Sequence, residues 1–160
     1  MLPLVLPHIA IGVGMLRLLQ VYTALPPFAG LLLVHVVLIL PFAVALLRTT
    51  VEQLDRALEH AAASLGAPPW RVFLAVVLPT IMPGVAVAGI LAFLISFGEV
   101  TLTSFLVTAR MTTLPVRIYA EASYSLEPTV YAISTLMIAL TVAAMFVLGR
   151  LVRLDRVFSR

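Results

Sequence analysis

Three long stretches of this 160-residue chain contain no Asp, Glu, Lys or Arg, and they constrain the fold more than any other feature. They are residues 18–47, 72–98 and 128–149, which are 30, 27 and 22 residues long. About 20 apolar residues of α-helix cross a hydrocarbon core, because each residue adds about 1.5 Å. Each stretch is therefore long enough to span a bilayer.

The overall composition excludes the soluble classes of protein. Hydrophobic residues make up 62% of the chain and charged residues 11%, whereas soluble domains have about 45–50% and about 25%. A soluble domain of about this size would still expose roughly 30% of its unfolded surface. Too few polar residues are present to cover that surface, so the chain is predicted to be an integral membrane protein.

The predicted fold is all-α, with about four transmembrane helices in a single transmembrane domain over residues 1–160. The expected spans are residues 2–19, 28–47, 72–96 and 129–149. The first span contains two prolines near its start and Arg17 near its end, where a long basic side chain reaches the interface.

The distribution of arginine predicts the orientation. Residues 48–71 and 150–160 together carry seven of the ten arginines, and the remainder of the chain carries three. Because basic residues collect on the cytoplasmic side, both of these segments are expected in the cytoplasm. The net charge of +3 is too small and too dispersed to indicate nucleic-acid binding.

Several kinds of chemistry are not expected from this sequence. The chain has no Cys and no Lys, which excludes thiol chemistry and the lysine-containing phosphate loop of P-loop ATPases. Neither a Ser-His-Asp arrangement nor a metal-ligand spacing occurs. We therefore expect no catalytic residue, cofactor or metal, and any ATP hydrolysis would take place in another chain.

The cytoplasmic segment 49–71 has the pattern of a short amphipathic helix. Residues 50–53 form a capping-box pattern, and Glu52 and Arg56 form a favourable i,i+4 pair. Gly66 is placed for a left-handed C-cap, and two prolines follow it. The apolar stripe comprises Val51, Leu54, Leu58, Ala61, Ala62 and Leu65. This stripe is expected to bury itself on the membrane surface, on the protein's own bundle, or in the groove of a soluble partner.

Part of this segment resembles a known signature. Residues 60–66 (His-Ala-Ala-Ala-Ser-Leu-Gly) are followed, after nine residues, by residues 76–79 (Val-Val-Leu-Pro). This resembles the cytoplasmic signature of binding-protein-dependent ABC importer permeases, which reads Glu-Ala-Ala, three residues, Gly, nine residues, Ile, one residue, Leu-Pro. Two positions differ, because His60 replaces Glu and Val76 replaces Ile.

The resemblance implies a coupling element that sits in a cleft of an ATPase subunit and transmits its closure to the membrane helices. It implies the interface residues Glu59, His60, Ala61, Ala62, Gly66, Leu78 and Pro79. It also places this chain in a bacterial plasma membrane. The partners that it implies are ATP-binding cassette subunits, a second permease subunit and an extracytoplasmic solute-binding protein.

Other segments resemble polyamine permeases within that family. Residues 96–99 and 113–119 look like the fifth helix and outer loop of that group, and residues 34–42 resemble its helix before the coupling loop. The group has Asp-Glu where this chain has Gly98-Glu99. A polyamine-like solute is therefore the leading expectation. Because family permeases commonly have six core helices, the chain resembles the C-terminal two-thirds of a permease.

Two polar residues are candidates for the substrate path. Glu99 lies at the outer end of an uncharged stretch, and an ionisable group at membrane depth is a functional hypothesis by default. The alternative is that Glu99 pairs with Arg110 or Arg117 at the interface. His35 lies inside a span, where a lone histidine is expected to make an interhelical hydrogen bond rather than to bind a metal.

Two other functions remain open from the sequence. One is an ion-coupled secondary transporter in which Glu99 and His35 titrate as a pair. The other is a truncated membrane fragment that does not transport. The cytoplasmic signature favours the ABC importer permease.

Overall fold

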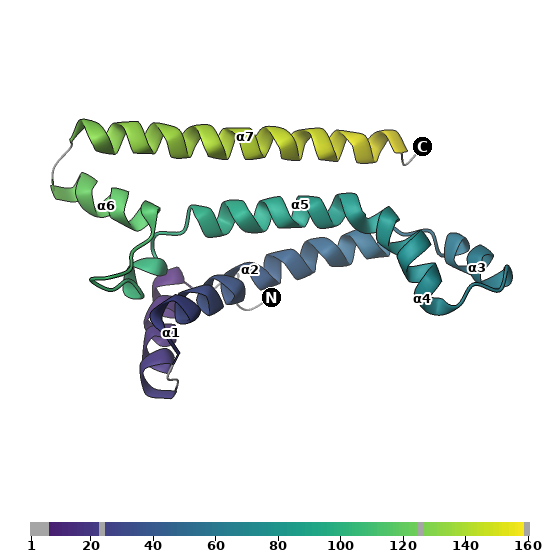
Figure 1. The fold of residues 1–160 in the computed structure, drawn as a ribbon, viewed down its shortest axis with the longest axis horizontal. Coiled ribbons are helices and arrows are strands. Elements are labelled where there is room, and N and C mark those ends of the chain that lie inside the picture. The colour runs from purple at the N-terminus through teal and green to yellow at the C-terminus, as the bar shows by residue number, and fades with distance from the viewer. Residues whose placement is uncertain (1–6, 23–24, 125–126, 159–160) are drawn as a thin grey trace. The chain divides into compact units, whose positions relative to one another are not determined.

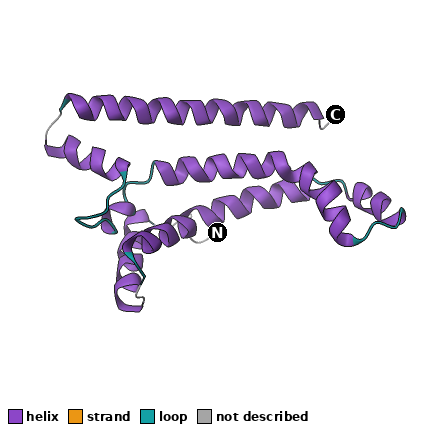
Figure 2. Cartoon of the chain, viewed as in Figure 1, coloured by secondary structure: helices purple, strands orange, loops and turns teal. Residues whose placement is uncertain are grey.

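The computed structural model describes residues 7–22, 25–124 and 127–158. In this part of the chain the elements are helices joined by loops, without a strand (Figures 1 and 2). They follow in the order α1 (His8–Tyr22), α2 (Pro27–Glu52), α3 (Arg56–Ser64), α4 (Pro69–Val72), the π-helix η2 (Phe73–Val77), α5 (Leu78–Phe97), the 3-10 helix η3 (Thr103–Phe105), α6 (Leu114–Tyr124) and α7 (Pro128–Phe158). The predicted all-α fold is confirmed.

Three helical runs are long and apolar enough to cross a membrane: Pro27–Glu52, Pro69–Phe97 and Pro128–Arg150. They contain the predicted spans 28–47, 72–96 and 129–149. The apolar part of α1, His8–Val21, is shorter than these three, and the predicted first span begins in residues outside the described part. The assignment of residues 1–160 to one transmembrane domain stays a prediction.

The start of the amphipathic helix differs from the prediction. α2 continues through the proposed capping box to Glu52, and the Thr50 hydroxyl donates to the Leu46 carbonyl oxygen at 2.9 Å. The cap of α3 is Asp55, which accepts a hydrogen bond from the Ala57 amide at 2.9 Å. A threonine inside a helix satisfies its own hydroxyl on the preceding turn, so the capping-box pattern did not mark a helix start here.

The predicted pair between Glu52 and Arg56 is wrong for the same reason. Because α2 extends to Glu52, this carboxylate lies one helical turn from Arg48 and accepts its hydrogen bond at 2.7 Å. Arg56 begins the next helix, beyond the break. The apolar stripe is divided at this break as well, so only its part from Leu58 onward belongs to α3 and the turn that follows.

The chain divides into two compact units. Unit 1 contains Met1–Pro41 and Ala92–Ala143, and unit 2 contains Phe42–Leu91 and Ala144–Arg160. The core of unit 1 joins one face of α2 to the segment around η3, with α1 and the end of α5 packed against it. Its buried members are Leu31, Val34, Leu38, Leu102 and Leu106.

Gly12 allows α1 to approach η3 closely in unit 1. A Cβ at this position would lie 2.8 Å from Cδ2 of Phe105 and 3.3 Å from the backbone Cα and carbonyl oxygen of Leu102. Two residues later, a Cβ on Gly14 would meet no atom within 4 Å. The glycine at position 12 is therefore required by packing.

Unit 2 places α3 against α4 and η2, where Val72 is buried. Figure 1 shows the two short helices joined by a tight turn. Elsewhere in this unit, Gly84 of α5 lies against the side chain of Thr50, leaving no room for a Cβ. The end of α2 and the start of α5 therefore approach each other at a glycine.

The G12A variant should be less stable than G14A by about 1–3 kcal/mol. Both substitutions carry the same gain in helix propensity, so their difference isolates the contact with η3. There the added methyl group must displace the Phe105 ring and presses on the backbone of Leu102. Thermal unfolding of the purified protein in detergent measures this difference. Equal midpoints for the two variants would show that α1 does not pack on η3 as described.

Candidate functional site

A pocket of about 330 Å³ lies in unit 1, where α2, α5 and the start of α6 converge. Its lining is mostly apolar and includes the aromatic rings of Phe28, Phe93 and Phe97. Four polar residues also line it: His35, Ser96, Glu99 and Thr113. The two predicted path residues, Glu99 and His35, are thus in one pocket although 64 positions separate them in the sequence.

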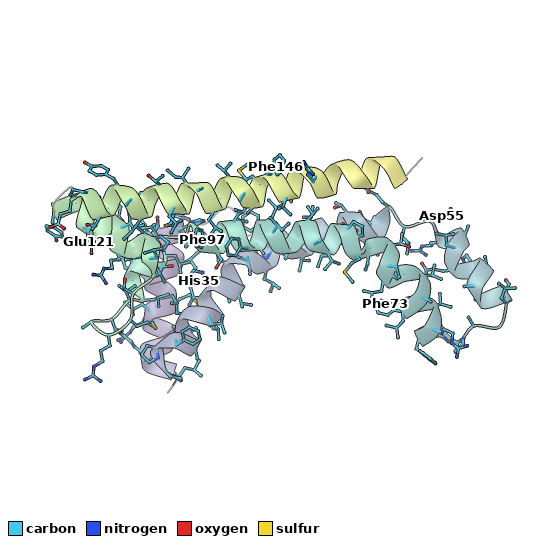
Figure 3. The ribbon with its side chains drawn as sticks, turned by 45° about the horizontal axis from the view of Figure 1, so that its top comes forward. His35, Asp55, Phe73, Phe97, Glu121 and Phe146 are labelled. Atoms are coloured by element: carbon cyan, nitrogen blue, oxygen red, sulfur yellow. The ribbon has the colours of Figure 1, made fainter. Side chains whose placement is uncertain are left out.

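The imidazole of His35 connects three elements of unit 1. Its Nδ1 lies 2.7 Å from the Ser96 hydroxyl of α5, and its Nε2 lies 3.0 Å from the Thr103 hydroxyl of η3. A neutral imidazole has one donor and one acceptor nitrogen, so one hydroxyl accepts from the ring and the other donates to it. The predicted interhelical hydrogen bond is confirmed. Figure 3 shows His35 and Phe97 in this part of unit 1.

Glu99 is buried, with 7% of its surface exposed. Its Oε1 accepts a hydrogen bond from the Leu102 amide at 2.7 Å, and its Oε2 lies 3.2 Å from Nδ1 of His8 at the start of α1. The backbone turn after α5 brings the Leu102 amide back over the carboxylate. This amide contact fixes the carboxylate at the pocket.

The alternative pairing of Glu99 with Arg110 or Arg117 is wrong. Arg117 donates to Glu121 at 2.8 Å on the same face of α6, and this hydrogen bond raises the pKa of the Arg117 guanidinium. Arg110 is exposed in the loop before α6. Arg117 pairs with Glu121, one helical turn away on its own helix. Glu99 instead lies next to His8, which is far from it in the sequence.

Glu99 and His35 do not form a direct pair in the described residues. Both ring nitrogens of His35 are occupied by hydroxyl groups, and each carboxylate oxygen of Glu99 already has a partner. Nor do the described residues contain a group of three or more acidic, histidine or cysteine side chains that would hold a metal ion. The two residues share a pocket, so their role in a substrate path stays a prediction.

Two features of the pocket were not predicted from the sequence. The rings of Phe93 and Phe97 stack with centroids 5.1 Å apart, and their spacing of four residues on one helix indicates a shared face. The Thr113 hydroxyl is buried and has no hydrogen-bond partner in the described part of the chain. No pattern in the sequence distinguishes Thr113 from its neighbour Thr112.

The predicted C-cap at Gly66 is confirmed by its backbone. Gly66 has φ +82°, and its amide donates to the Ala63 carbonyl at 2.9 Å while the Ala67 amide donates to the Ala62 carbonyl at 3.3 Å. These two bonds form a Schellman motif, in which a left-handed residue closes the helix. The alanines and the glycine of the signature therefore correspond to a helix end and a sharp turn.

This turn presents apolar side chains on the surface of unit 2. Leu65 is 89% exposed and Trp70 60% exposed, and His60 and Ala61 are also exposed. Leu78 and Pro79 lie elsewhere, at the junction of η2 and α5. The structure thus places most of the predicted interface residues around one turn and the Leu-Pro pair outside it.

Leu78 and Pro79 stand where η2 passes into α5, within the helical run Pro69–Phe97. Pro79 has no amide hydrogen, and the preceding turn widens into η2, in which the Leu78 amide donates to the Phe73 carbonyl. The Thr80 hydroxyl donates to the Val76 carbonyl at 2.7 Å. A proline that removes one backbone bond is a common cause of such a π-turn, and the helical run Pro69–Phe97 continues through it.

The sequence model of one protein family, described as "Binding-protein-dependent transport system inner membrane component", matches residues 1–155. This chain belongs to that family. The resemblance inferred from residues 60–79 is thereby confirmed. The family consists of transport permease subunits of inner membranes, not enzymes.

Curated relatives of the family are similar over most of this chain. The putrescine transport system permease protein PotI of Escherichia coli is 32% identical over 145 residues, covering 85% of this chain and 50% of PotI. The spermidine/putrescine transport system permease protein PotC of Haemophilus influenzae is 32% identical, covering 91% of this chain and 56% of PotC. The molybdenum transport system permease protein ModB of E. coli is 37% identical over 111 residues. The chain spans about half the length of these relatives.

The G66V variant should destabilise the α3–α4 turn by about 1–2 kcal/mol, because an L-residue at φ +82° is strained although no atom lies within 4 Å of its Cβ. Asparagine visits this conformation more readily, so G66N should recover most of the loss. Limited proteolysis of the turn in membranes measures the effect. Equal cleavage of G66V and G66N would contradict a strained backbone as the cause.

Proposed function

We propose that this chain is a membrane-spanning permease subunit of an ATP-driven importer and forms part of the path of a small solute. Family membership and the similarity to PotI and PotC support this proposal. The observation that carries it is the exposed Schellman turn at Gly66, which gives the family signature the form of a docking element. ATP hydrolysis belongs to a separate cassette subunit.

In this mechanism the ATPase contacts the turn around Gly66. The small side chains of Ala61 and Ala62 allow a close approach, and the exposed Leu65 and Trp70 supply apolar surface that a partner buries. The helical run Pro69–Phe97 starts directly after this turn and ends at two rings of the pocket. Movement of the turn is thus passed into a membrane helix without an intervening loop.

His60 changes the electrostatics of this interface relative to the family signature. An imidazole, which cannot carry a negative charge at neutral pH, replaces a carboxylate. The neighbouring Glu59 is rotated by about 100° around α3 and does not occupy the same direction. The interface of this chain therefore relies more on the apolar surface of the turn than on an ion pair at position 60.

The remaining parts of the proposal concern assembly and orientation. A second permease subunit completes the path, because one subunit of this size does not enclose a route, and an extracytoplasmic binding protein delivers the solute. The positive-inside rule puts the turn at Gly66 and the C-terminus in the cytoplasm of a bacterial cell.

The proposed solute is a polyamine-like cation. PotI and PotC carry the names of putrescine and spermidine systems, whereas ModB carries that of a molybdenum system. The charge of the pocket favours the first group, since the described residues of its lining include the Glu99 carboxylate and no arginine. A single carboxylate complements one ammonium group.

Uptake of labelled putrescine by cells expressing the complete transport system tests the energy source. We expect uptake to stop when ATP is depleted with the proton gradient intact, because the cassette subunits drive the cycle. A protonophore applied at constant ATP should leave uptake unchanged. The opposite pattern would favour the ion-coupled secondary transporter.

A single-cysteine crosslink tests the docking turn, since the chain has no native Cys. The L65C variant should capture the ATPase subunit in native membranes, and mass spectrometry should identify a lysine-containing phosphate loop in the captured protein. The control is R110C, in the exposed loop of unit 1, which should capture no ATPase. Absence of a crosslink from L65C, or equal capture at both positions, would contradict docking at this turn.

The G98D variant tests the preference for cations. A Cβ at Gly98 meets only the Leu94 carbonyl oxygen, at 3.5 Å, so an added carboxylate is accommodated beside Glu99. We expect the KM for putrescine uptake to fall by about threefold to tenfold, as for about 1 kcal/mol of added attraction. G98N is the neutral control. A KM that changes equally in both variants would show that charge at this position is irrelevant.

A further inference from the structure

We propose that the contact between Thr50 of α2 and Gly84 of α5 couples these two helices, so that movement of the turn at Gly66 reaches α2 as well as α5. This inference deepens the proposed function and rests on it for the partner that moves the turn. The contact and the turn both lie within unit 2.

Thr50 and Gly84 lie so close together that only glycine fits at position 84. A Cβ on Gly84 would lie 2.9 Å from Cβ of Thr50 and closer still to its Cγ2 and Oγ1, whereas carbon atoms in contact are about 3.5–4.0 Å apart. The Thr50 hydroxyl donates to the Leu46 carbonyl oxygen at 2.9 Å, which holds the side chain in one orientation. Small residues allow such close approach of membrane helices. The contact therefore joins a fixed side chain on one helix to a glycine on the other.

The contact closes a loop of the chain that contains the turn at Gly66. Thr50 is in the last turn of α2, and Gly84 is near the start of α5, 34 positions later. Between them the chain forms α3, the turn, α4 and η2, and α3 packs against both α4 and η2. The backbones of α2 and α5 make no extensive contact in the described part of the chain. A local contact thus joins the two ends of a loop whose interior is already packed.

The route from the turn into α5 passes through positions at which a helix can bend. η2 is a π-helix, and Pro79 and Pro83, which follow it, each lack a backbone amide hydrogen. Such positions are where helices kink. The packing of α3 on η2 restrains the bend before Pro79, and the seat of Thr50 on Gly84 restrains it afterwards. Movement of the turn then shifts the end of α2 and the start of α5 as a pair.

A reciprocal exchange of the two residues tests the contact. G84A adds a methyl group where Thr50 leaves no room, and T50G removes all three atoms that this methyl group would meet most closely. The double variant T50G/G84A moves the glycine to the other helix and restores a close contact. For residues in contact, the effects of two single variants do not add, so recovery in the double variant identifies a direct contact.

Two control variants match the single ones. G89A lies on the same helix as G84A, at a position where a Cβ meets no atom within 4 Å. T49G has the same loss of helix propensity as T50G and removes an exposed hydroxyl that donates to the same Leu46 carbonyl oxygen, at 2.8 Å. Neither control changes the atoms that lie nearest to Gly84.

The measurement is the amount of labelled putrescine imported per ATP hydrolysed by the complete transport system in liposomes. We expect this ratio to fall about fivefold in T50G and in G84A, and to recover to within about twofold in T50G/G84A, as for a pair of residues in contact. G89A and T49G should keep the wild-type ratio. A wild-type ratio in T50G, or a double variant that is worse than either single one, would overturn the proposal.

Loss of fold is measured separately. Thermal unfolding in detergent and co-purification with the ATPase subunit show whether each variant folds and assembles. G84A should unfold at a lower temperature than G89A, because the added volume strains the crossing. T50G adds no volume, so it keeps the test valid if G84A does not fold.

Spin labels follow the two ends of the loop without any transport. The labelled positions are E52C and T80C, which are exposed in unit 2, and the chain has no native Cys. In the complete system in lipid nanodiscs, the distance between the labels should stay the same when ADP is exchanged for ATP, because both helix ends move as a pair. T50G should broaden the distribution of distances. A distance that changes with the nucleotide while Thr50 and Gly84 are both present would overturn the proposal.

The two proposals fail in different ways. ATP-dependent uptake of putrescine with an unchanged ratio in T50G would overturn the role of the contact and leave the proposed function standing. Absence of ATP-dependent uptake in the wild type, with a label distance that broadens in T50G, would overturn the proposed function. It would still support the contact as the join between the two helix ends.

Discussion

The hydrogen bonds of His35 are the interaction on which the arrangement of unit 1 depends. In an apolar environment a polar side chain has no water to bond with, so it must find partners within the protein. His35 on α2 bonds Ser96 on α5 and the fully buried Thr103 on η3. These contacts hold together segments that are 61 and 68 positions apart in the sequence. Because Glu99 is three residues after Ser96, the hydrogen bond between His35 and Ser96 also positions Glu99.

A different constraint forms the turn between α3 and α4 in unit 2. The left-handed backbone of Gly66 ends α3, and Leu65 beside it is 89% exposed. After the turn, the chain continues through the π-helix η2 into α5, within the helical run Pro69–Phe97. The pocket belongs to unit 1 and the turn to unit 2.

Local patterns predicted the helices well and their contacts poorly. Gly66 was recognisable as a C-cap because only the residue type matters at a positive φ. The capping-box pattern at 50–53 was misleading, because α2 continues through it to Glu52. The N-cap of the next helix is Asp55. The partner of Glu99 was assigned wrongly because His8 lies 91 positions away and no local rule connects the two.

The sequence by itself determined that this is a helical membrane protein of the binding-protein-dependent permease family, because uncharged stretches and signature spacing are properties of consecutive residues. Only the tertiary structure brought Glu99, Phe97 and Thr113 to one pocket and buried the Thr113 hydroxyl without a hydrogen-bond partner among the described residues. The physical reason is that hydrogen bonds and packing between distant segments depend on how helices meet. The packing of two helices depends on all the side chains at their interface, not on any local pattern.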